Sequence, residues 1–382
     1  MRGHFRLCSA GFSIAGESPL SKHLQIRGLC TSLVLVGCVL SASAAWGQRA
    51  YLPLTTISST NGDAIRPQVD SFVKDAVTKI ESTDPAAQKA GRDTLTDAAN
   101  NANASDVFLD VLASSLNGQL LATKLSDNKD LRSRLNAAIA VSRVAAKASA
   151  KTPNTKLEPI TEKLISDKSQ PVNLWGIKAA ESILPAMLIT HQDVKHLAQL
   201  IIESVKDHSD CAECGTTVEE AYHALTLSDA KGVPPEAVKG FVQYPMQLLA
   251  WRVSMYQTVI PPSPSADTEA TSFFVKDVAW SAMDAAQRAQ ALKLMEDLLE
   301  GIDKQIPQAG DNKGQLVDSI KYTGYAIQAS GDLLKSTDLK NAGQKIASMG
   351  NDPSPDELTN RIEAFKNAIR ATSLPAPAPI AS

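Results

Sequence analysis

Apolar residues recur along most of the chain at steps of three and four residues, the spacing that places side chains on one face of a helix. Two of the clearest runs are Val69, Phe72, Val73, Ala76, Val77 and Ile80, and Phe108, Leu109, Leu112, Leu116, Leu120 and Leu121. Aromatic residues make up only 5% of the sequence, while Ala and Leu are abundant, which favours closely packed helices over strands. The pattern therefore predicts an all-α protein.

The helical pattern also repeats after about 40 residues. Corresponding positions are Leu125-Ser126-Asp127 with Ile165-Ser166-Asp167, Leu135 with Trp175, Ile139 with Ala179, and Val144 with Leu184. In the helix from near Lys129 to Ala148, the residues expected to face inward are Leu131, Leu135, Ala138, Ile139, Val144 and Ala145. A repeat of paired amphipathic helices is typical of an α-solenoid, in which each unit buries its apolar face against its neighbours.

Two stretches show how such a helix would begin. In Asp84-Pro85-Ala86, the Asp can cap free backbone N–H groups and the Pro suits the first helical position. With its later small residues and Arg92 before Leu95, this stretch resembles the second helix of a HEAT repeat. Ser169 to Ala180 is the best such match, although Pro171 lacks the preceding Asp. The resemblance implies helix pairs that pack against one another, with no catalytic role for these positions.

Prolines and composition divide the chain into six expected segments. These are a signal peptide over 1–47, an irregular segment over 48–66, a HEAT-like helical repeat region over 67–260, a Pro-rich linker over 261–267, a C-terminal helical region over 268–371, and a flexible Pro/Ala tail over 372–382. Pro261, Pro262 and Pro264 mark the expected domain boundary. Pro185 and Pro245 are each expected to kink or interrupt a helix.

The first 47 residues have the features of a targeting segment. Four basic residues stand against the single acid Glu17, and an apolar run from Gly28 to Leu40 follows. That run is too short to cross a bilayer core of about 30 Å as a helix. Because Ala42-Ser43-Ala44 fits an A-x-A cleavage site, we expect cleavage near Ala45 and a periplasmic or secreted protein.

A lipid anchor is the alternative reading of the same segment. Leu35-Val36-Gly37-Cys38 resembles the lipobox after which bacterial lipoproteins are cut and acylated on Cys. Val39 and Leu40 continue the apolar run beyond Cys38, where lipoproteins usually become polar, so simple export is preferred.

Charge limits the possible partners. Four of 38 basic and one of 41 acidic residues lie in the leader, so its removal leaves 34 basic against 40 acidic residues, a net charge of −6. A mildly acidic chain without a Lys/Arg cluster lacks the electrostatic footprint of nucleic-acid binding. No later segment is continuously apolar over a membrane-spanning length, so we expect no membrane span and no nucleic-acid partner.

Cys211-Ala212-Glu213-Cys214 is the arrangement with most chemical potential. Three of the five cysteines lie in the leader, and in an exported chain the remaining pair is most simply a disulfide. His208, Cys211, Cys214 and His223 could instead supply four zinc ligands, and a thioredoxin-type redox pair is a further alternative. Covalent haem attachment needs a His directly after the second Cys, where this chain has Gly215.

Other catalytic patterns are missing from the sequence. It contains no GxGxxG, GxxxxGK[ST], G-x-S-x-G or H-E-x-x-H motif. His191 and His196 are expected to face solvent, and the adjacent acids Glu219-Glu220 and Glu296-Asp297 to point different ways as solvated charge. We therefore expect no enzyme and no cofactor, but a non-catalytic exported scaffold that binds an unknown protein partner in the cell envelope. The alternatives are a metal-binding or redox-active protein using Cys211 and Cys214, and an envelope lipoprotein anchored through Cys38.

Overall fold

The computed structural model describes residues 51–124, 127–208, 215–228 and 232–377, and all regular secondary structure in these residues is helical. The prediction of an all-α fold is confirmed. The helices of the first half are α1 (Leu54–Ile57), α2 (Gly62–Ile80), α3 (Pro85–Ala99), α4 (Asp106–Ala122), α5 (Leu131–Lys151), α6 (Glu158–Ile165), α7 (Gln170–Ile189), α8 (Lys195–Asp207) and α9 (Gly215–Leu225).

The second half contains shorter helices at first and then long ones. They are α10 (Pro235–Val238), α11 (Gln243–Met255), η3 (Pro264–Ala266), α12 (Asp267–Phe274), α13 (Asp277–Ala282), α14 (Ala285–Gln305), η4 (Ile306–Gln308), η5 (Gly310–Asn312), α15 (Lys313–Leu334), α16 (Thr337–Ala347) and α17 (Pro355–Ala371).

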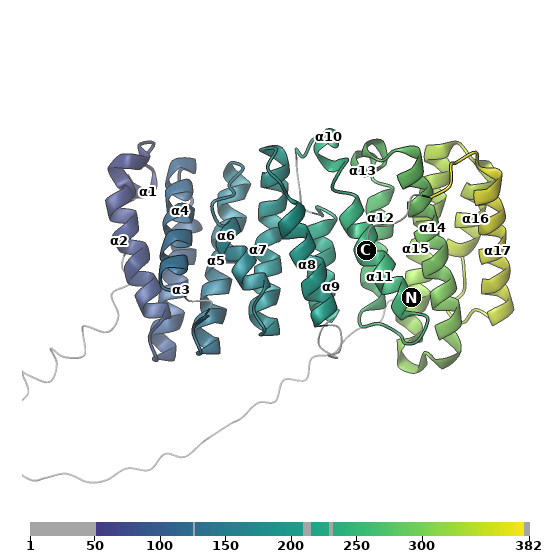
Figure 1. The fold of residues 1–382 in the computed structure, drawn as a ribbon, viewed down its shortest axis with the longest axis horizontal. Coiled ribbons are helices and arrows are strands. Elements are labelled where there is room, and N and C mark those ends of the chain that lie inside the picture. The colour runs from purple at the N-terminus through teal and green to yellow at the C-terminus, as the bar shows by residue number, and fades with distance from the viewer. Residues whose placement is uncertain (1–50, 125–126, 209–214, 229–231, 378–382) are drawn as a thin grey trace, which may run out of the picture. The chain divides into compact units, whose positions relative to one another are not determined.

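Helices α2 to α9 pack in a regular order (Figure 1). The first helices of each pair, α2, α4, α6 and α8, contact one another in chain order, and so do the second helices, α3, α5, α7 and α9. Within a pair, α2 packs on α3, α4 on α5, α6 on α7 and α8 on α9. Every helix thus buries its apolar face between its partner and the neighbouring pairs.

Local sequence explains where the second helices begin. The carboxylate of Asp84 accepts a hydrogen bond from the Ala86 backbone N–H at 2.9 Å, and Pro85 occupies the first position of α3. Asp130 caps α5 by accepting from the backbone N–H groups of Arg132 and Ser133. The predicted cap at Asp84 is confirmed.

Glycines allow two of the pairs to pack closely. A Cβ at Gly91 of α3 would overlap the Ala76 carbonyl of α2, and one at Gly176 of α7 would lie 2.7 Å from the Ile165 backbone nitrogen. Helix backbones therefore touch at these positions, which a larger residue would force apart.

The helices begin earlier than the sequence suggested. Within the expected irregular segment 48–66, α1 is already formed and α2 starts at Gly62, so Pro67 lies inside a helix. The reason is a cap at Asn61, whose side chain accepts from the Ala64 backbone N–H at 3.2 Å and starts α2 before the proline.

Other local expectations also need correction. Helix α7 continues through Pro185 to Ile189, because flanking side chains such as Leu184 and Met187 are buried and hold both halves in place. Pro245 lies in the first turn of α11, where its missing N–H costs no helical hydrogen bond. Leu131, expected to face inward, is 45% exposed because it is the first residue of α5.

Residues 261–267 do not separate two domains as expected. They lie within one compact unit, Arg49–Ser382, and Pro264 to Ala266 form the short helix η3. Asp267 is completely buried and contacts Arg252, Tyr222 and Tyr256. The prolines thus shape a turn that a buried ion pair fixes to α9 and α11.

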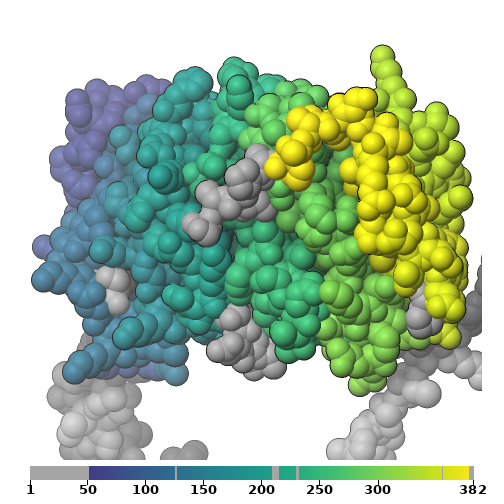
Figure 2. All heavy atoms as spheres, turned by 45° about the vertical axis from the view of Figure 1, so that its right-hand side comes forward, coloured from purple at the N-terminus to yellow at the C-terminus, as the bar shows by residue number. Residues whose placement is uncertain are grey.

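Helices α15 and α16 have the tightest contact in the C-terminal region. Added Cβ atoms at Gly324, Gly331 and Gly343 would each meet backbone of the facing helix at less than van der Waals distance. Beyond α17, Leu374 packs partly buried against the core, and Figure 2 shows the yellow C-terminal residues running back over the green helices. This part of the expected flexible tail is therefore packed.

Among the described residues, one helix, α7, is long and apolar enough to cross a membrane by length and composition, although no such span was expected from the sequence. Its apolar window is 61% buried within the protein, and α7 contacts α5, α6 and α9. These contacts identify α7 as a core helix.

Candidate functional site: a groove on the second helices

A hollow with a volume of about 640 Å³ lies between α5 and α7. A neighbouring hollow of about 580 Å³ extends the surface to α3. The two share Arg143, Ala146 and Trp175, so we treat them as one feature, the Trp175 groove. Its walls are Arg92, Asp93, Thr96, Asn100, Ile139, Ser142, Arg143, Ala146, Lys147, Ser149, Ala150, Pro153, Trp175, Lys178, Glu181, Ser182, Pro185, Ala186 and Ile189.

Trp175 lies at the junction of the two hollows and is half-buried. The Arg143 Cζ atom lies 5.4 Å from the centroid of its ring, and the Lys178 Nζ atom lies 5.5 Å from it. Both distances are within the range of cation–π attraction. The ring therefore combines apolar surface with two nearby positive charges.

Arg143 and Lys178, the two basic neighbours of Trp175, differ in their other partners. Lys178 forms an ion pair with Glu220 of α9. Arg143 is exposed and, within the residues that the structure describes, forms no ion pair with a carboxylate. The same holds in the described residues for Lys147, one turn further along α5.

Polar side chains connect α3 to α5 and α7 to α9. The Gln88 amide of α3 donates to the Asp130 carboxylate at 2.6 Å and to Ser133 at 2.9 Å, and Arg92 donates to Asn136 at 3.1 Å. Further along, Gln170 donates to Thr217 at 3.4 Å. Hydrogen bonds therefore join α3 to α5 and α7 to α9, and the contact of Arg143 with Trp175 lies between α5 and α7.

These links perturb two carboxyl groups. A hydrogen bond from Ser133, with a further one from Gln88, lowers the pKa of Asp130 below its ordinary value despite some desolvation. Burial alone would raise the pKa of Asp93, but hydrogen bonds from Lys89 and Arg92 more than offset this effect and lower it. Both groups are held as anions that orient neighbouring cations and amides.

Of the four predicted zinc ligands, the structure describes His208 and His223. Cys211 and Cys214 lie outside the described residues, as do Cys38 and Ala45 of the leader. His208 ends α8, with its Nδ1 atom 2.8 Å from the Ser204 carbonyl oxygen. The disulfide, zinc and redox readings stay predictions.

His223, the fourth candidate ligand, lies between two carboxylates. Its Nε2 atom is 2.7 Å from Glu269 Oε1 of α12, and its Nδ1 atom is 3.8 Å from Glu220 Oε2. Burial raises the pKa of Glu269, although His223 opposes this shift. The ring is thus engaged in connecting α9 to α12.

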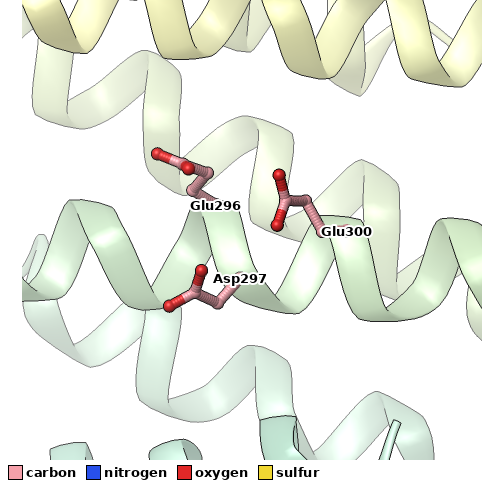
Figure 3. A group of neighbouring side chains, drawn as sticks. All are labelled: Glu296, Asp297 and Glu300. Atoms are coloured by element: carbon pink, nitrogen blue, oxygen red, sulfur yellow. The ribbon is translucent and has the colours of Figure 1, made fainter. Parts of the chain in front are cut away.

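The remaining histidines and acids are on the surface or paired. His191 and His196 are exposed, as expected. Carboxylate oxygens of Glu296, Asp297 and Glu300 lie within 4.8 Å of one another (Figure 3). The expectation that Glu296 and Asp297 point apart is wrong, because Lys293 pairs with them at 2.7 and 2.8 Å.

The third acid of that cluster, Glu300, has a cation of its own. Its carboxylate lies 2.5 Å from Lys366 Nζ of α17. Each acid of the cluster therefore already pairs with a lysine, and the cluster is better explained as a set of ion pairs than as a metal centre.

Comparisons with known proteins give no family. No protein-family model and no curated protein matches the chain. Two solved structures of engineered proteins from the Northeast Structural Genomics Consortium align with 79% and 84% of this chain and 98% of their own. Their sequence identities are 16% and 13% and their TM-scores 0.34 and 0.32, too low to establish a common fold.

The fold and groove therefore define the class only broadly, as an all-helical protein with a basic, Trp-centred groove. Sequence patterns identified Trp175 as a repeat position, but gave no sign that it lines a groove. The charge of α5 was the available signal, since every charged residue from Leu131 to Lys151 is basic.

Proposed function

We propose that the chain is an exported, non-catalytic scaffold of HEAT-like helix pairs that binds a protein partner in the cell envelope. The observation that carries this proposal is the Trp175 groove, which spans three successive second helices, α3, α5 and α7. Surfaces of this kind, formed by neighbouring repeats, are what helical-repeat proteins offer to their partners.

A repeating arrangement is supported by the spacing of the links between helices. The hydrogen bonds that join α3 to α5 and α7 to α9 connect residues separated by 42, 45, 44, 47 and 42 positions. On the first helices and their loops, the Asn117 side chain accepts from the Ile160 backbone N–H across 43 positions. Separations this uniform are expected when one helix pair follows another with little change in geometry.

The equivalence of Leu135 and Trp175 also supports a repeat. Both are half-buried residues on second helices, and both pack against the main core. The two positions are alike in burial, while the larger Trp side chain reaches into the groove.

The chemistry of the groove favours binding over catalysis. Among its described walls are hydroxyls such as Ser142, Ser149 and Ser182, but no His or Cys that could activate a nucleophile. Trp and Arg are instead the residue types enriched at the energetic centres of protein interfaces.

Capture from an envelope extract tests the proposal. Wild-type protein and a Trp175→Ala variant would be immobilised, exposed to extract from the source cells and cross-linked. A control variant would carry Tyr325→Ala, which removes an exposed aromatic ring of α15. We expect one protein to be retained by the wild type and the control and lost from Trp175→Ala. Equal retention by all three would exclude the groove as the binding site.

Export and anchoring are tested on the mature chain. We expect its N-terminus near Ala45 by intact mass and its recovery in the aqueous phase after detergent partitioning. An acylated Cys38 at the N-terminus would show that the same scaffold is a lipoprotein instead.

A second mass measurement tests the cysteine alternative. We expect Cys211 and Cys214 to be oxidised to a disulfide with no metal bound. Stoichiometric zinc in the native protein would favour the metal-binding reading.

A further inference from the structure

Helix α5 carries an unbalanced charge that its neighbours do not share. Its charged residues are Arg132, Arg134, Arg143, Lys147 and Lys151, with no acid. In α3 the bases Lys89 and Arg92 are balanced by Asp93 and Asp97, and in α7 Lys178 is balanced by Glu181. The positive charge is therefore concentrated on the helix at the middle of the Trp175 groove.

Within the described residues, most of this charge has no carboxylate partner. Arg134 pairs with Asp167 at 2.8 Å, but in the described residues Arg143 and Lys147 have no carboxylate partner. They are four positions apart, so their charges face the same side of α5 and repel each other. An anionic ligand at this position would relieve that repulsion.

Arg143 is also held ready to bind a carboxylate. Its guanidinium packs against the Trp175 ring, with Cζ 5.4 Å from the centroid. Its N–H groups donate no hydrogen bond to the described residues. A stacked guanidinium keeps its donor edge available for two parallel bonds to a carboxylate.

Between its charged and hydroxyl-bearing side chains, which include the acids Asp93 and Glu181, the groove also has small apolar residues. Ala146, Ala150 and Pro153 line it beside α5, and Ala186 and Ile189 line it beside α7. Small side chains leave room for aliphatic groups of a ligand next to the Trp175 ring. The groove thus offers both carboxylate-binding cations and an apolar floor.

We propose that the Trp175 groove binds an acidic polypeptide segment. Its carboxylates would pair with Arg143 and Lys147. Its intervening apolar side chains would pack on Trp175 and on the small residues Ala146, Ala150 and Ala186. This inference rests on the proposed function and specifies the chemistry of the partner. A nucleic acid is less well matched, because the whole chain is acidic, with a net charge of −3, and the unbalanced positive charge of the groove lies on one helix.

Fluorescence polarisation with a labelled peptide of Glu, Leu and Ser tests the inference. A second peptide would carry Lys in place of every Glu, and a third probe would be oligothymidylate. The groove variant is Arg143→Glu/Lys147→Glu. The matched control is Lys74→Glu/Lys195→Glu, which makes the same change of charge at exposed residues of α2 and α8.

We expect the Glu peptide to bind the wild type and the control equally and the groove variant about tenfold more weakly or worse. Added salt would weaken its binding, and the Lys peptide would not bind. Both variants should unfold at the same thermal midpoint as the wild type. This result would show that the groove substitutions weaken peptide binding without destabilising the fold.

Three results would overturn the inference. They are equal affinity of the Glu peptide for both variants, binding of the Lys peptide as tightly as the Glu peptide, and Arg143-dependent binding of oligothymidylate alone. If the Glu peptide does not bind, but the Trp175→Ala variant still fails to retain the envelope partner, only the proposed acidic chemistry of the partner is wrong. If both tests fail, the proposed function fails as well.

Discussion

Arg252 and Asp267 form an ion pair in the interior of the protein, with Arg252 Nε 2.6 Å from Asp267 Oδ1 and a second bond of 3.0 Å to Oδ2. Both side chains are almost fully buried. The hydroxyls of Tyr222 and Tyr256 each donate to Asp267 at 2.9 Å. Arg252 also donates to the carbonyls of Pro262 and Ser263, so the pair holds the proline-rich turn against α11.

Removing one member of this pair should destabilise the protein severely. Asp267→Ala leaves a buried guanidinium without its counter-charge, and we expect a loss of about 3–5 kcal/mol in the free energy of unfolding. Denaturant unfolding followed by circular dichroism measures this loss.

Replacing both Arg252 and Asp267 separates the effect of an unpaired buried charge from the effect of lost side-chain packing. Arg252→Met/Asp267→Leu should recover much of the lost stability, because no uncompensated buried charge remains. A single Asp267→Ala variant within about 1 kcal/mol of the wild type would show that the pair is not buried as described.

Burial also raises the pKa of Tyr222 and Tyr256. Desolvation, together with the charge of Asp267, raises the pKa of Tyr222 and Tyr256 well above the ordinary value. Both phenols therefore stay protonated at neutral pH and donate to Asp267.

Close packing of α15 on α16 gives a second prediction. Gly343→Ala would place a methyl group against the Gln328 backbone, and we expect a loss of about 1–3 kcal/mol. The matched control is Gly118→Ala, at an exposed position inside α4 with open space around it. This change should stabilise by about 0.5–1 kcal/mol. Equal effects of the two substitutions on the unfolding midpoint would rule out backbone contact at Gly343.

The cap of α5 gives a third prediction. Asp130→Ala removes a helix cap and also the acceptor for Gln88 and Ser133, so we expect a loss toward the upper end of about 0.5–2 kcal/mol. Asp84→Ala removes only the corresponding cap of α3 and should cost less. Urea midpoints for the two variants make the comparison, and a larger loss for Asp84→Ala would argue against the link between α3 and α5.

Glu269 predicts a specific dependence on pH. Burial raises its pKa in the folded protein above its ordinary value near 4.5, and one oxygen of its carboxylate has no hydrogen-bond partner among the described residues. The folded state therefore binds this proton more tightly than the unfolded state does. Its contribution to stability is present below the ordinary pKa and is lost as pH rises through the raised value.

A Glu269→Gln variant should not show this loss of stability as pH rises, because it has no carboxyl group to titrate at this position. His223, Glu219 and Lys276 also face Glu269, so the comparison must be made as a difference between variant and wild type at each pH. Thermal midpoints that fall in parallel for both proteins as pH rises through this range would contradict the assignment.

Helix positions were predictable because they depend on residues close in sequence. The apolar period of Val69 to Ile80 and the Asp84-Pro85 start both report local physics, and both correspond to observed helices. Proline patterns misled where tertiary contacts decided the outcome. The turn around Pro262 reads as a linker, and only the distant Arg252 reveals that it is anchored.

The candidate site was less predictable than the fold. Whether Trp175 is buried in the core or lines a groove depends on Arg143 and Ala146 of the preceding second helix, which the local sequence around Trp175 does not contain. The acidic cluster illustrates the same point, since Lys293 draws Glu296 and Asp297 together.

Fluorine NMR of protein labelled with 5-fluorotryptophan tests binding in the groove most directly. The sequence has four Trp residues, and Trp175→Phe assigns the resonance of the groove. Titration with the Glu, Leu and Ser peptide should shift the Trp175 resonance and leave that of Trp280, which packs against Arg288, unchanged. A bound peptide that shifts other resonances while Trp175 stays in place would contradict the account.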